Sequence, residues 1–310
     1  MTPGYQALAG SAAILDLSDR GRIRVTGEDR ARLLHAMTTN HVQQLKPGEG
    51  QYTFFLNAQG QIQADAYVLC FADHLLLDVE PHARHKIYEH LDHFIIADDV
   101  TLEDVTEQTF ALGLEGPHAL RMAAELGMTA PHAAFAHTEW DPYSVAAISF
   151  TGGHGVRVYG PALRKDDAIG VLASSGAIEA TAEDAEAFRI TQFKPRYGQD
   201  ITERSLPQET QQMSAVHFQK GCYLGQEIVE RVRSRGHINR LLMGFAGDSE
   251  HAPAVGAKVA YGGKEDGEVT SAVAVDGKFY GLAVVRAQIA QAGVIVGIEG
   301  RPATMVALAA

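Results

Sequence analysis

The stretch Lys220-Gly221-Cys222-Tyr223-Leu224-Gly225-Gln226-Glu227 carries the most information in this chain of 310 residues. One of only two cysteines stands between two glycines and close to a lysine. Glycine permits backbone conformations and close approaches that other residues resist, and a neighbouring cation favours the reactive thiolate form of cysteine. The stretch therefore predicts a tight turn that presents the Cys222 thiol beside a binding site, with Lys220 tuning its charge.

The composition is that of an acidic, globular chain. Apolar residues make up 46% and charged residues 21% of it, and the formal net charge is −12. The length predicts two or three packed units, and the acidity argues against a broad nucleic-acid-binding surface. Against this background a basic run stands out as a local site for an anionic ligand, formed by Arg231, Arg233, Arg235, His237 and Arg240.

Cysteine usage and hydropathy limit the other protein classes. Two cysteines give neither a disulfide framework nor a four-cysteine zinc site. Cys70 lies in an apolar run and is expected to be a small buried residue. No run reaches the ~18 apolar residues of a membrane span, and the first residues lack a signal-peptide pattern. We therefore expect a cytoplasmic protein without a membrane partner.

Alternating polarity in the N-terminal half predicts a hairpin and places one acid on it. Residues 51–56 and 61–71 read as two strands around a turn at 57–60. In the second strand the apolar residues share one face, and Asp65 lies on the other face with Gln61, Gln63 and Tyr67. That polar face is either solvated or part of a cleft, and periodicity alone favours the solvated interpretation.

Two helices and one glycine-rich turn follow from local signals. Residues 81–96 predict a helix with proline in its first turn. Residues 183–191 predict a short helix capped by Thr181. The glycines of the segment 151–155 predict a hairpin turn, with an anion cradle as the alternative.

The character of the chain changes after Arg240. Short apolar runs alternate with Gly, Asp and Pro turns, at 241–245, 258–261, 268–275, 279–285, 294–298 and 304–308. Helical periodicity is nearly absent there, and the spacing fits a small antiparallel β-barrel or sandwich. We therefore predict one region over residues 1–240 and a C-terminal β-barrel over residues 241–310.

The octapeptide at 220–227 resembles the signature of the folate-binding YgfZ proteins, which are relatives of the glycine-cleavage T-protein, an aminomethyltransferase. Leu206-Pro207-Gln208-Glu209 is similar to the step before that signature, and Arg231-x-x-x-Arg235-Gly236 to its continuation. In the N-terminal half, the order of the elements also resembles the wider superfamily. The resemblance covers nearly the whole chain, and the octapeptide is its specific part.

The resemblance implies an α+β fold. Two interleaved α+β units of the T-protein type would surround a central folate-binding channel, and the C-terminal barrel would complete the molecule. The implied cofactor is tetrahydrofolate or a derivative.

Several positions depart from the T-protein pattern. The T-protein loop with a folate-holding glutamate appears here as Thr151-Gly152-Gly153-His154-Gly155, without the acid. A second acid is missing from the step Phe188-Arg189-Ile190-Thr191-Gln192-Phe193. Asp65 matches an acidic T-protein position, but its usual partner acid is Ala64 here. The sole tryptophan, Trp140, lies outside the segments where some YgfZ proteins stack folate. These departures argue against aminomethyl transfer of the T-protein kind.

The folate site implied by the resemblance needs polar groups that pair with the pterin, an aromatic or apolar wall, and cations for the glutamate tail. Asp65 and Glu209 are the candidates for pairing, and Tyr223 is the candidate wall. The matched motifs add Arg189, Gln226 and Glu227 as cofactor contacts.

The alternating arginines are the candidates for the folate tail. In a strand, Arg231, Arg233 and Arg235 would share one face and meet its carboxylates. The alternative is an exposed basic edge strand that prevents aggregation, and the resemblance favours the ligand.

YgfZ proteins are implicated in making or repairing iron–sulfur clusters in selected enzymes. The resemblance therefore implies a tetrahydrofolate-binding accessory protein for iron–sulfur cluster assembly or repair, which acts through Cys222 with Lys220 beside it. Its partners would be iron–sulfur client proteins or assembly factors, and no nucleic acid.

Two further functions stay open at this point. The alternative is a tetrahydrofolate-dependent aminomethyl or one-carbon transferase, with Asp65 as the acid near a folate nitrogen. The third is a module that binds folate without chemistry. The sequence also leaves three roles for Cys222, as a nucleophile, a transient iron ligand or a structural residue. It does not decide whether the protein is an enzyme.

Overall fold

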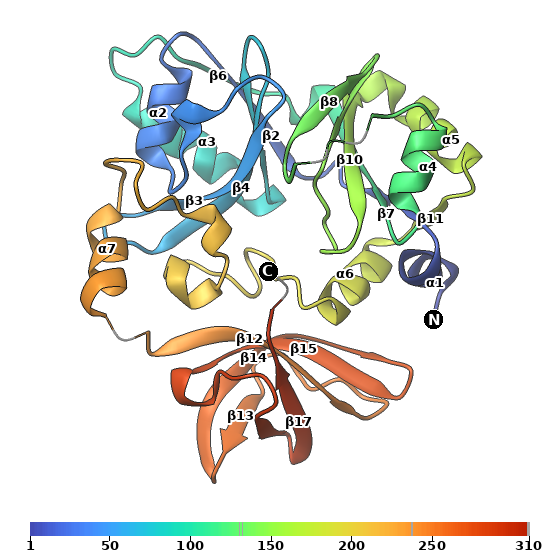
Figure 1. Cartoon of the computed structure of the whole chain (residues 1–310), viewed down its shortest axis with the longest axis vertical. Coiled ribbons are helices and arrows are strands. Elements are labelled where there is room, and N and C mark those ends of the chain that lie inside the picture. The colour runs from blue at the N-terminus through green and yellow to red at the C-terminus, as the bar shows by residue number, and fades with distance from the viewer. Residues whose placement is uncertain (130, 132, 237, 309–310) are drawn as a thin grey trace.

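The computed structural model describes residues 1–129, 131, 133–236 and 238–308. Two α/β units lie side by side above a β-barrel, and the linker after α6 (Ala182–Thr191) runs through the centre between them (Figure 1). The predicted helix at 183–191 is confirmed. Thr181 caps it: its hydroxyl accepts a hydrogen bond from the Asp184 backbone N–H, and the Asp184 carboxylate accepts one from the Thr181 backbone N–H.

The first unit is built on a five-stranded sheet with the order β3-β4-β5-β2-β6. Its neighbouring strands pair antiparallel, and the predicted hairpin is confirmed as β3 and β4. Two helices, α2 and α3, cover the sheet (Figure 1). The elements are β2 (Gly21–Thr26), α2 (Arg30–Met37), β3 (Gly50–Leu56), β4 (Ile62–Cys70), β5 (Leu75–Val79), α3 (Arg84–Phe94) and β6 (Thr101–Asp104).

The second unit is a six-stranded sheet with the order β11-β1-β7-β10-β9-β8. Its first strand, β1, comes before the whole five-stranded sheet in the sequence, so the two units interleave. A separate apolar core lies between this sheet and the helices α4 and α5. The elements are α1 (Pro3–Gly10), β1 (Ala13–Asp16), β7 (Thr109–Glu115), α4 (Ala119–Glu125), β8 (His137–Trp140), β9 (Tyr143–Ala146), β10 (Gly155–Pro161), α5 (Lys165–Ser174) and β11 (Ile178–Ala180).

The C-terminal strands close into a barrel with the order β12-β15-β14-β13-β16-β17. All neighbouring strands pair antiparallel, so the barrel alternative of the prediction is confirmed and the sandwich is not. Its inward side chains form a third core. The strands are β12 (Arg240–Asp248), β13 (Lys258–Tyr261), β14 (Lys264–Val275), β15 (Lys278–Arg286), β16 (Ile295–Ile298) and β17 (Arg301–Val306).

A buried ionic network joins the two sheets. Asp78 on β5 accepts hydrogen bonds from Arg20, from Arg157 on β10 at 2.7 Å and from the Tyr159 hydroxyl at 2.6 Å. Arg20 also pairs with Glu80. The Arg20 and Arg157 guanidinium groups hold the pKa of the Asp78 carboxyl well below its usual range despite the burial. The two units are therefore held together by matched charges as well as by apolar packing.

The arginine run after the cysteine stretch is a helix, not a strand. Helix α7 (Gln226–Arg235) begins after Gly225, whose φ of 83° lies in the left-handed region that favours glycine. Arg231 pairs with Glu227, and Arg233 with Glu230, at helical spacings of four and three residues. The strand prediction was wrong because alternation of charge alone does not exclude a helix with such pairs. At about 100° per residue, Arg231 and Arg233 lie on opposite sides.

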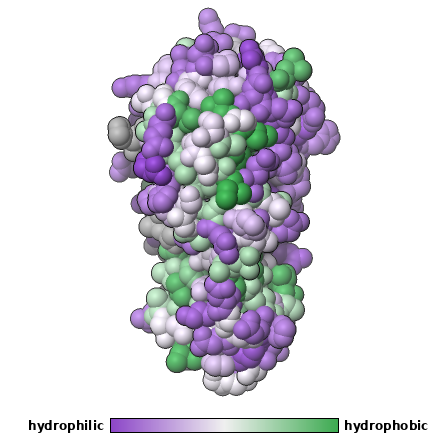
Figure 2. All heavy atoms as spheres, turned by 90° about the vertical axis from the view of Figure 1, so that its right-hand side faces the viewer, coloured by the Kyte–Doolittle hydropathy of each residue, from purple (hydrophilic) through white to green (hydrophobic). Residues whose placement is uncertain are grey.

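Polar residues cover most of the face seen from the side of the second unit, and apolar residues gather on its upper part (Figure 2). The exposed apolar side chains of this unit are Leu120, Leu163, Val171 and Ile178. Within the described ranges, no helix has the length and apolar character needed to cross a membrane.

Candidate functional site

A small hollow lies at the centre of the molecule, where the two units and the linker after α6 meet. Its volume is about 20 Å³, which is close to the space that one water molecule needs. Aromatic rings and charged groups line it together. The lining residues are Arg20, Tyr52, Asp65, Tyr67, Glu80, Phe150, Arg157, Arg189, Lys194, Pro195 and Arg196.

Asp65 on β4 is the acid of this hollow. It is buried, with 9% of its surface exposed, so the cleft interpretation of its strand face is correct and the solvated one is wrong. The Tyr52 hydroxyl donates a hydrogen bond of 2.7 Å to Oδ2, and Oδ1 has no partner among the described residues. Burial, followed by the charge of Glu80, raises the pKa of Asp65 to about 6.

Arg157 on β10 is the second group with unused hydrogen-bonding capacity in the hollow. The residue has 0% exposure. Its Nη1 donates to Asp78, and within the described part of the chain Nε and Nη2 find no acceptor. The guanidinium carbon lies 5.2 Å from the centre of the Tyr67 ring. Two residues that line the hollow thus carry two buried, unpaired N–H donor groups and one buried, unpaired carboxylate oxygen.

Arg189 on α6 lines the hollow, but its guanidinium group is already hydrogen-bonded to other residues of the protein. The guanidinium donates to Asp200 at 2.8 Å, to Gln199 at 2.8 Å and to Ser271 on β14 at 3.2 Å. It also pairs with Glu186. All three guanidinium nitrogens of Arg189 donate hydrogen bonds to protein groups. The bonds to the linker and to Ser271 tie α6 and the linker to the barrel. The structure gives Arg189 a role in docking the barrel.

The Cys222 stretch forms an exposed loop on the outer side of the first unit, between α2 and α7 (Figure 1). Backbone atoms of the loop make hydrogen bonds to α2. The Leu224 backbone N–H donates to the Ala36 carbonyl, and the His35 imidazole Nε2 lies 2.9 Å from the Lys220 carbonyl. None of the residues that line the central hollow belongs to this loop. The structure therefore places the Cys222 thiol and Asp65 in different parts of the molecule.

Lys220 is buried beneath the loop rather than exposed beside the thiol. Its Nζ donates to the backbone carbonyls of His35 and Thr38 at the end of α2, where the helix leaves carbonyls without internal partners. Burial lowers the pKa of the Lys220 ammonium to about 7. The contacts of Lys220 in the structure thus anchor the loop, and they leave its effect on the Cys222 thiol as a prediction.

Tyr223 and Glu209 lie outside the hollow as well. Tyr223 is buried, with the Lys220 Nζ 4.8 Å from its ring centre. Glu209 accepts a hydrogen bond of 2.9 Å from the Leu206 backbone N–H and lines a polar groove between the linker and the barrel. Of the residues predicted to contact folate, the hollow therefore brings together only Asp65 and Arg189.

The remaining predicted contacts belong to α7. Gln226 and Glu227 occupy its first turn. The carboxylate of Glu227 is paired with Arg231, and both side chains are largely exposed. The side chain of Arg235 lies outside the described part of the structure. None of the described side chains of α7 lines the central hollow.

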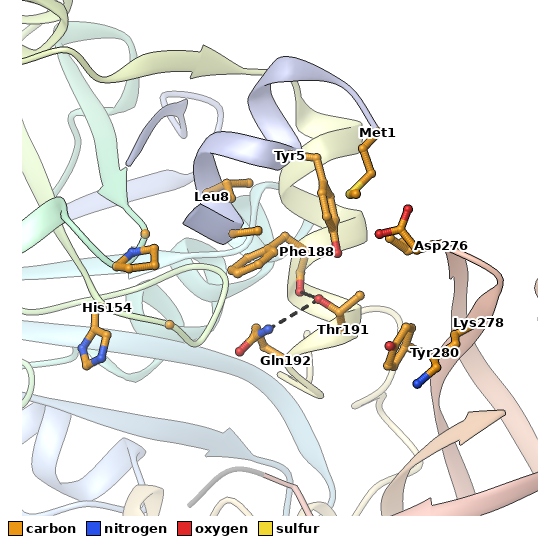
Figure 3. Close-up of a pocket in the computed structure, with 15 residues that line it drawn as sticks. Met1, Tyr5, Leu8, His154, Phe188, Thr191, Gln192, Asp276, Lys278 and Tyr280 are labelled. Atoms are coloured by element: carbon orange, nitrogen blue, oxygen red, sulfur yellow. Dashed lines mark hydrogen bonds between the residues drawn. The ribbon is translucent and has the colours of Figure 1, made fainter. Parts of the chain in front are cut away.

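A wider groove of about 680 Å³ runs beside α6. Tyr5 of α1 and Phe188 of α6 meet edge to face with ring centres 5.7 Å apart. Figure 3 shows these rings facing Tyr280 and Lys278 of the barrel across the opening, with Thr191 and Gln192 between them. Among the described residues, no predicted folate contact lines this groove, but residues of the two segments that lack the T-protein acids do, among them Gly153 and Thr191. Residue spacing did not reveal it because five separate segments form its walls.

The sequence also missed Tyr52, Glu80 and Arg157 as parts of the hollow. The sequence offered weak signals for two of them: Tyr52 is a polar residue in a predicted strand, and Glu80 is an acid just before a predicted helix. Arg157 gave the best signal, since a lone arginine amid the apolar residues of β10 needs a buried partner.

Comparison with known proteins assigns the chain to a family. The family of the GCVT N-terminal domain matches residues 3–220, which is more than half of the chain. The chain belongs to the GCVT N-terminal domain family. The matched segment of this GCVT-type protein includes both units and ends at Lys220.

Related sequences cover almost the whole GCVT-type chain. A chloroplastic protein of Arabidopsis thaliana, provisionally named a transferase, is 29% identical over 93% of this chain and 68% of that protein. The aminomethyltransferase of Rubrobacter xylanophilus is 28% identical over 96% of this chain and 82% of that protein. The Bacillus subtilis aminomethyltransferase is 24% identical over 96% of this chain and 86% of that protein.

The fold matches that of a solved T-protein. Aminomethyltransferase T of the glycine cleavage system from Bartonella henselae superposes with a TM-score of 0.86 over 99% of this chain and 87% of that chain, at 18% sequence identity. The predicted fold class, two interleaved α+β units of the T-protein type with a C-terminal antiparallel barrel, is thereby confirmed.

Proposed function

We propose that this GCVT-type protein binds tetrahydrofolate in the central hollow and supports iron–sulfur proteins through the exposed Cys222 thiol, as the YgfZ resemblance implies. The observation that carries the proposal is the separation of the thiol from the hollow. A thiol that acted on a buried one-carbon group would have to line the hollow. Cys222 is exposed on an anchored loop, where a partner protein has access to it.

The residues of the hollow fit a folate in chemical type. The buried Asp65 Oδ1 has no partner among the described residues and would accept a hydrogen bond from a pterin N–H. Tyr52, Tyr67 and Phe150 supply aromatic walls. Lys194, from the linker, adds a cation that suits a carboxylate tail. A pterin needs more than the present 20 Å³, so its entry requires the partly exposed Phe150 and Lys194 side chains to move aside.

The transferase alternative rests on Asp65. A carboxyl with a pKa raised to about 6 exchanges a proton readily near neutral pH, as a general acid or base must. When bound, tetrahydrofolate would supply the nitrogen that accepts the one-carbon unit. The relatives named aminomethyltransferases favour this function, and the acids missing from the segments 151–155 and 188–193 weigh against it.

Calorimetric titration with tetrahydrofolate tests the binding part of the proposal. We expect the wild type and Cys222→Ala to bind equally, because the loop does not line the hollow. Asp65→Asn should bind about 10-fold more weakly, since one charge-assisted hydrogen bond is lost. Absence of binding in the wild type would refute the folate assignment.

A replacement strain tests the thiol. In cells whose own gene copy carries Cys222→Ser, iron–sulfur enzyme activities should fall while the protein level stays constant. Cys70→Ser is the matched control, because Cys70 is the buried cysteine. Unchanged cluster enzyme activity in the Cys222→Ser strain would eliminate the iron–sulfur role, and turnover of an aminomethyl donor that Asp65→Asn abolishes would establish the transferase.

A further inference from the structure

Three buried polar atoms, on two residues that line the hollow, indicate the chemistry of its ligand. Oδ1 of Asp65, Nε of Arg157 and Nη2 of Arg157 lack a hydrogen-bond partner within the described residues. Both residues line the same hollow. Buried polar groups are nearly always paired in native proteins, and leaving them unpaired costs free energy. The complement is a ligand edge that carries a hydrogen-bond donor beside an acceptor oxygen.

The two unpaired groups together favour a neutral edge. A carboxylate or phosphate would satisfy Arg157 but would leave Asp65 Oδ1 without a donor. A cation would satisfy Asp65 but would face Arg20, Arg157 and Lys194. A neutral lactam, with C=O next to N–H, satisfies both groups without introducing a charge.

We infer that Arg157 is a specificity-determining residue that donates to the carbonyl oxygen of a lactam edge whose N–H is bound by Asp65. This inference rests on the proposed folate function and deepens it. The pterin end of the folate, with its C4 carbonyl and N3–H, enters the hollow, and the glutamate tail stays outside. Guanine carries the same edge, so the chemistry identifies the edge and the experiment identifies its source.

Arg20 provides a built-in comparison with Arg157. Both guanidinium groups are buried and both bind Asp78. Arg20 has a second carboxylate partner in Glu80, whereas Arg157 keeps two nitrogens unused. A lysine at either position retains the positive charge next to Asp78 and loses the fork of donors. Arg157→Lys therefore removes the proposed contact with the ligand. Arg20→Lys perturbs the ionic network in a similar way and keeps that contact.

The test compares two ligands at pH 8 by calorimetry. Tetrahydrofolate has the lactam edge, and its 4-amino-4-deoxy analogue replaces the acceptor oxygen by an amino donor and the N3–H donor by an acceptor. We expect the wild type to prefer tetrahydrofolate by about 10- to 100-fold, the range for hydrogen bonds to charged groups. The preference should largely disappear in Arg157→Lys and persist in Arg20→Lys.

The outcomes separate this inference from the proposed function. Equal binding of both ligands by the wild type, or an undiminished preference in Arg157→Lys, would overturn the inference and leave folate binding intact. The wild-type comparison decides even if Arg157→Lys fails to fold, which its thermal unfolding profile reveals. If the wild type binds guanosine and not tetrahydrofolate, the edge assignment stands and the folate function fails. Absence of binding for all three ligands would refute both.

Discussion

Replacing Asp78 by asparagine should destabilise the protein more than any surface change, because Asp78 is the carboxylate on which two buried arginines converge. Asp78 has 0% exposure and accepts hydrogen bonds from Arg20, Arg157 and Tyr159. Glu80 remains as a partner for Arg20. Asp78 is the carboxylate that pairs with Arg157 among the described residues, so the variant leaves that buried guanidinium without a counter-charge.

The expected loss follows from this geometry. Removing one partner of a buried ion pair costs about 3–5 kcal/mol, since the other charge stays desolvated. Urea unfolding followed by circular dichroism measures the difference in unfolding free energy between wild type and Asp78→Asn. The control is Asp73→Asn, because the Asp73 side chain is 82% exposed and, among the described residues, its ion pair is with His74. Its effect should stay below about 1 kcal/mol.

The pH dependence gives the same prediction an independent check. The pKa of Asp78 is depressed in the folded state, so its stabilisation is present above the unfolded-state pKa of about 4 and is lost as the pH falls below it. The difference in unfolding free energy between wild type and Asp78→Asn should therefore become smaller below about pH 4. A loss under about 1 kcal/mol at pH 7 would show that Arg157 does not depend on Asp78, and would refute the account of how the units are joined.

Three further predictions concern the hollow and the loop. The pKa of Asp65 is raised in the folded state to about 6, so its contribution to stability is present below about pH 4 and is lost as the pH rises through about 6. The urea midpoint of the wild type should therefore fall between pH 4 and 7, and the midpoint of Asp65→Asn should lack this fall. Lys220→Met should lower the unfolding free energy by about 1–3 kcal/mol, because two helix-end carbonyls lose their donor, and exposed Lys264→Met should not; equal effects would contradict the anchoring role. A thiol reagent with mass-spectrometric mapping should label Cys222 in the folded protein and Cys70 only after unfolding, and prior labelling of Cys70 would contradict the described burial.

Much of the architecture could be predicted from the residues. The β3–β4 hairpin, the capped helix α6 and the C-terminal barrel follow from alternation, capping and turn residues, which are local signals. The interleaving of the two units did not follow from local signals. It came from the resemblance of the octapeptide and is confirmed by the fold match.

The predicted site fared less evenly. Strand alternation placed Asp65 on a polar face and favoured a solvated one, because alternation fixes the face of a strand but not what covers it. The resemblance to an acidic T-protein position made Asp65 a site candidate. Cys222 was predicted to lie next to a binding site, and the structure instead places it on an outer loop. Arg231 and Arg233 were assigned to a strand because alternating charges also fit a helix stabilised by pairs with Glu227 and Glu230.

The sequence by itself determined most of the secondary elements and the family signature, because these depend on neighbours within a few positions. Only the tertiary structure decided that Asp65 and Arg157, 92 positions apart, line one space, and that Lys220 lies beneath its loop. Burial, charge pairing and the number of unused donors depend on packing between distant segments. The chemistry of the hollow can therefore be inferred only from the structure in which the two sheets pack around Asp78.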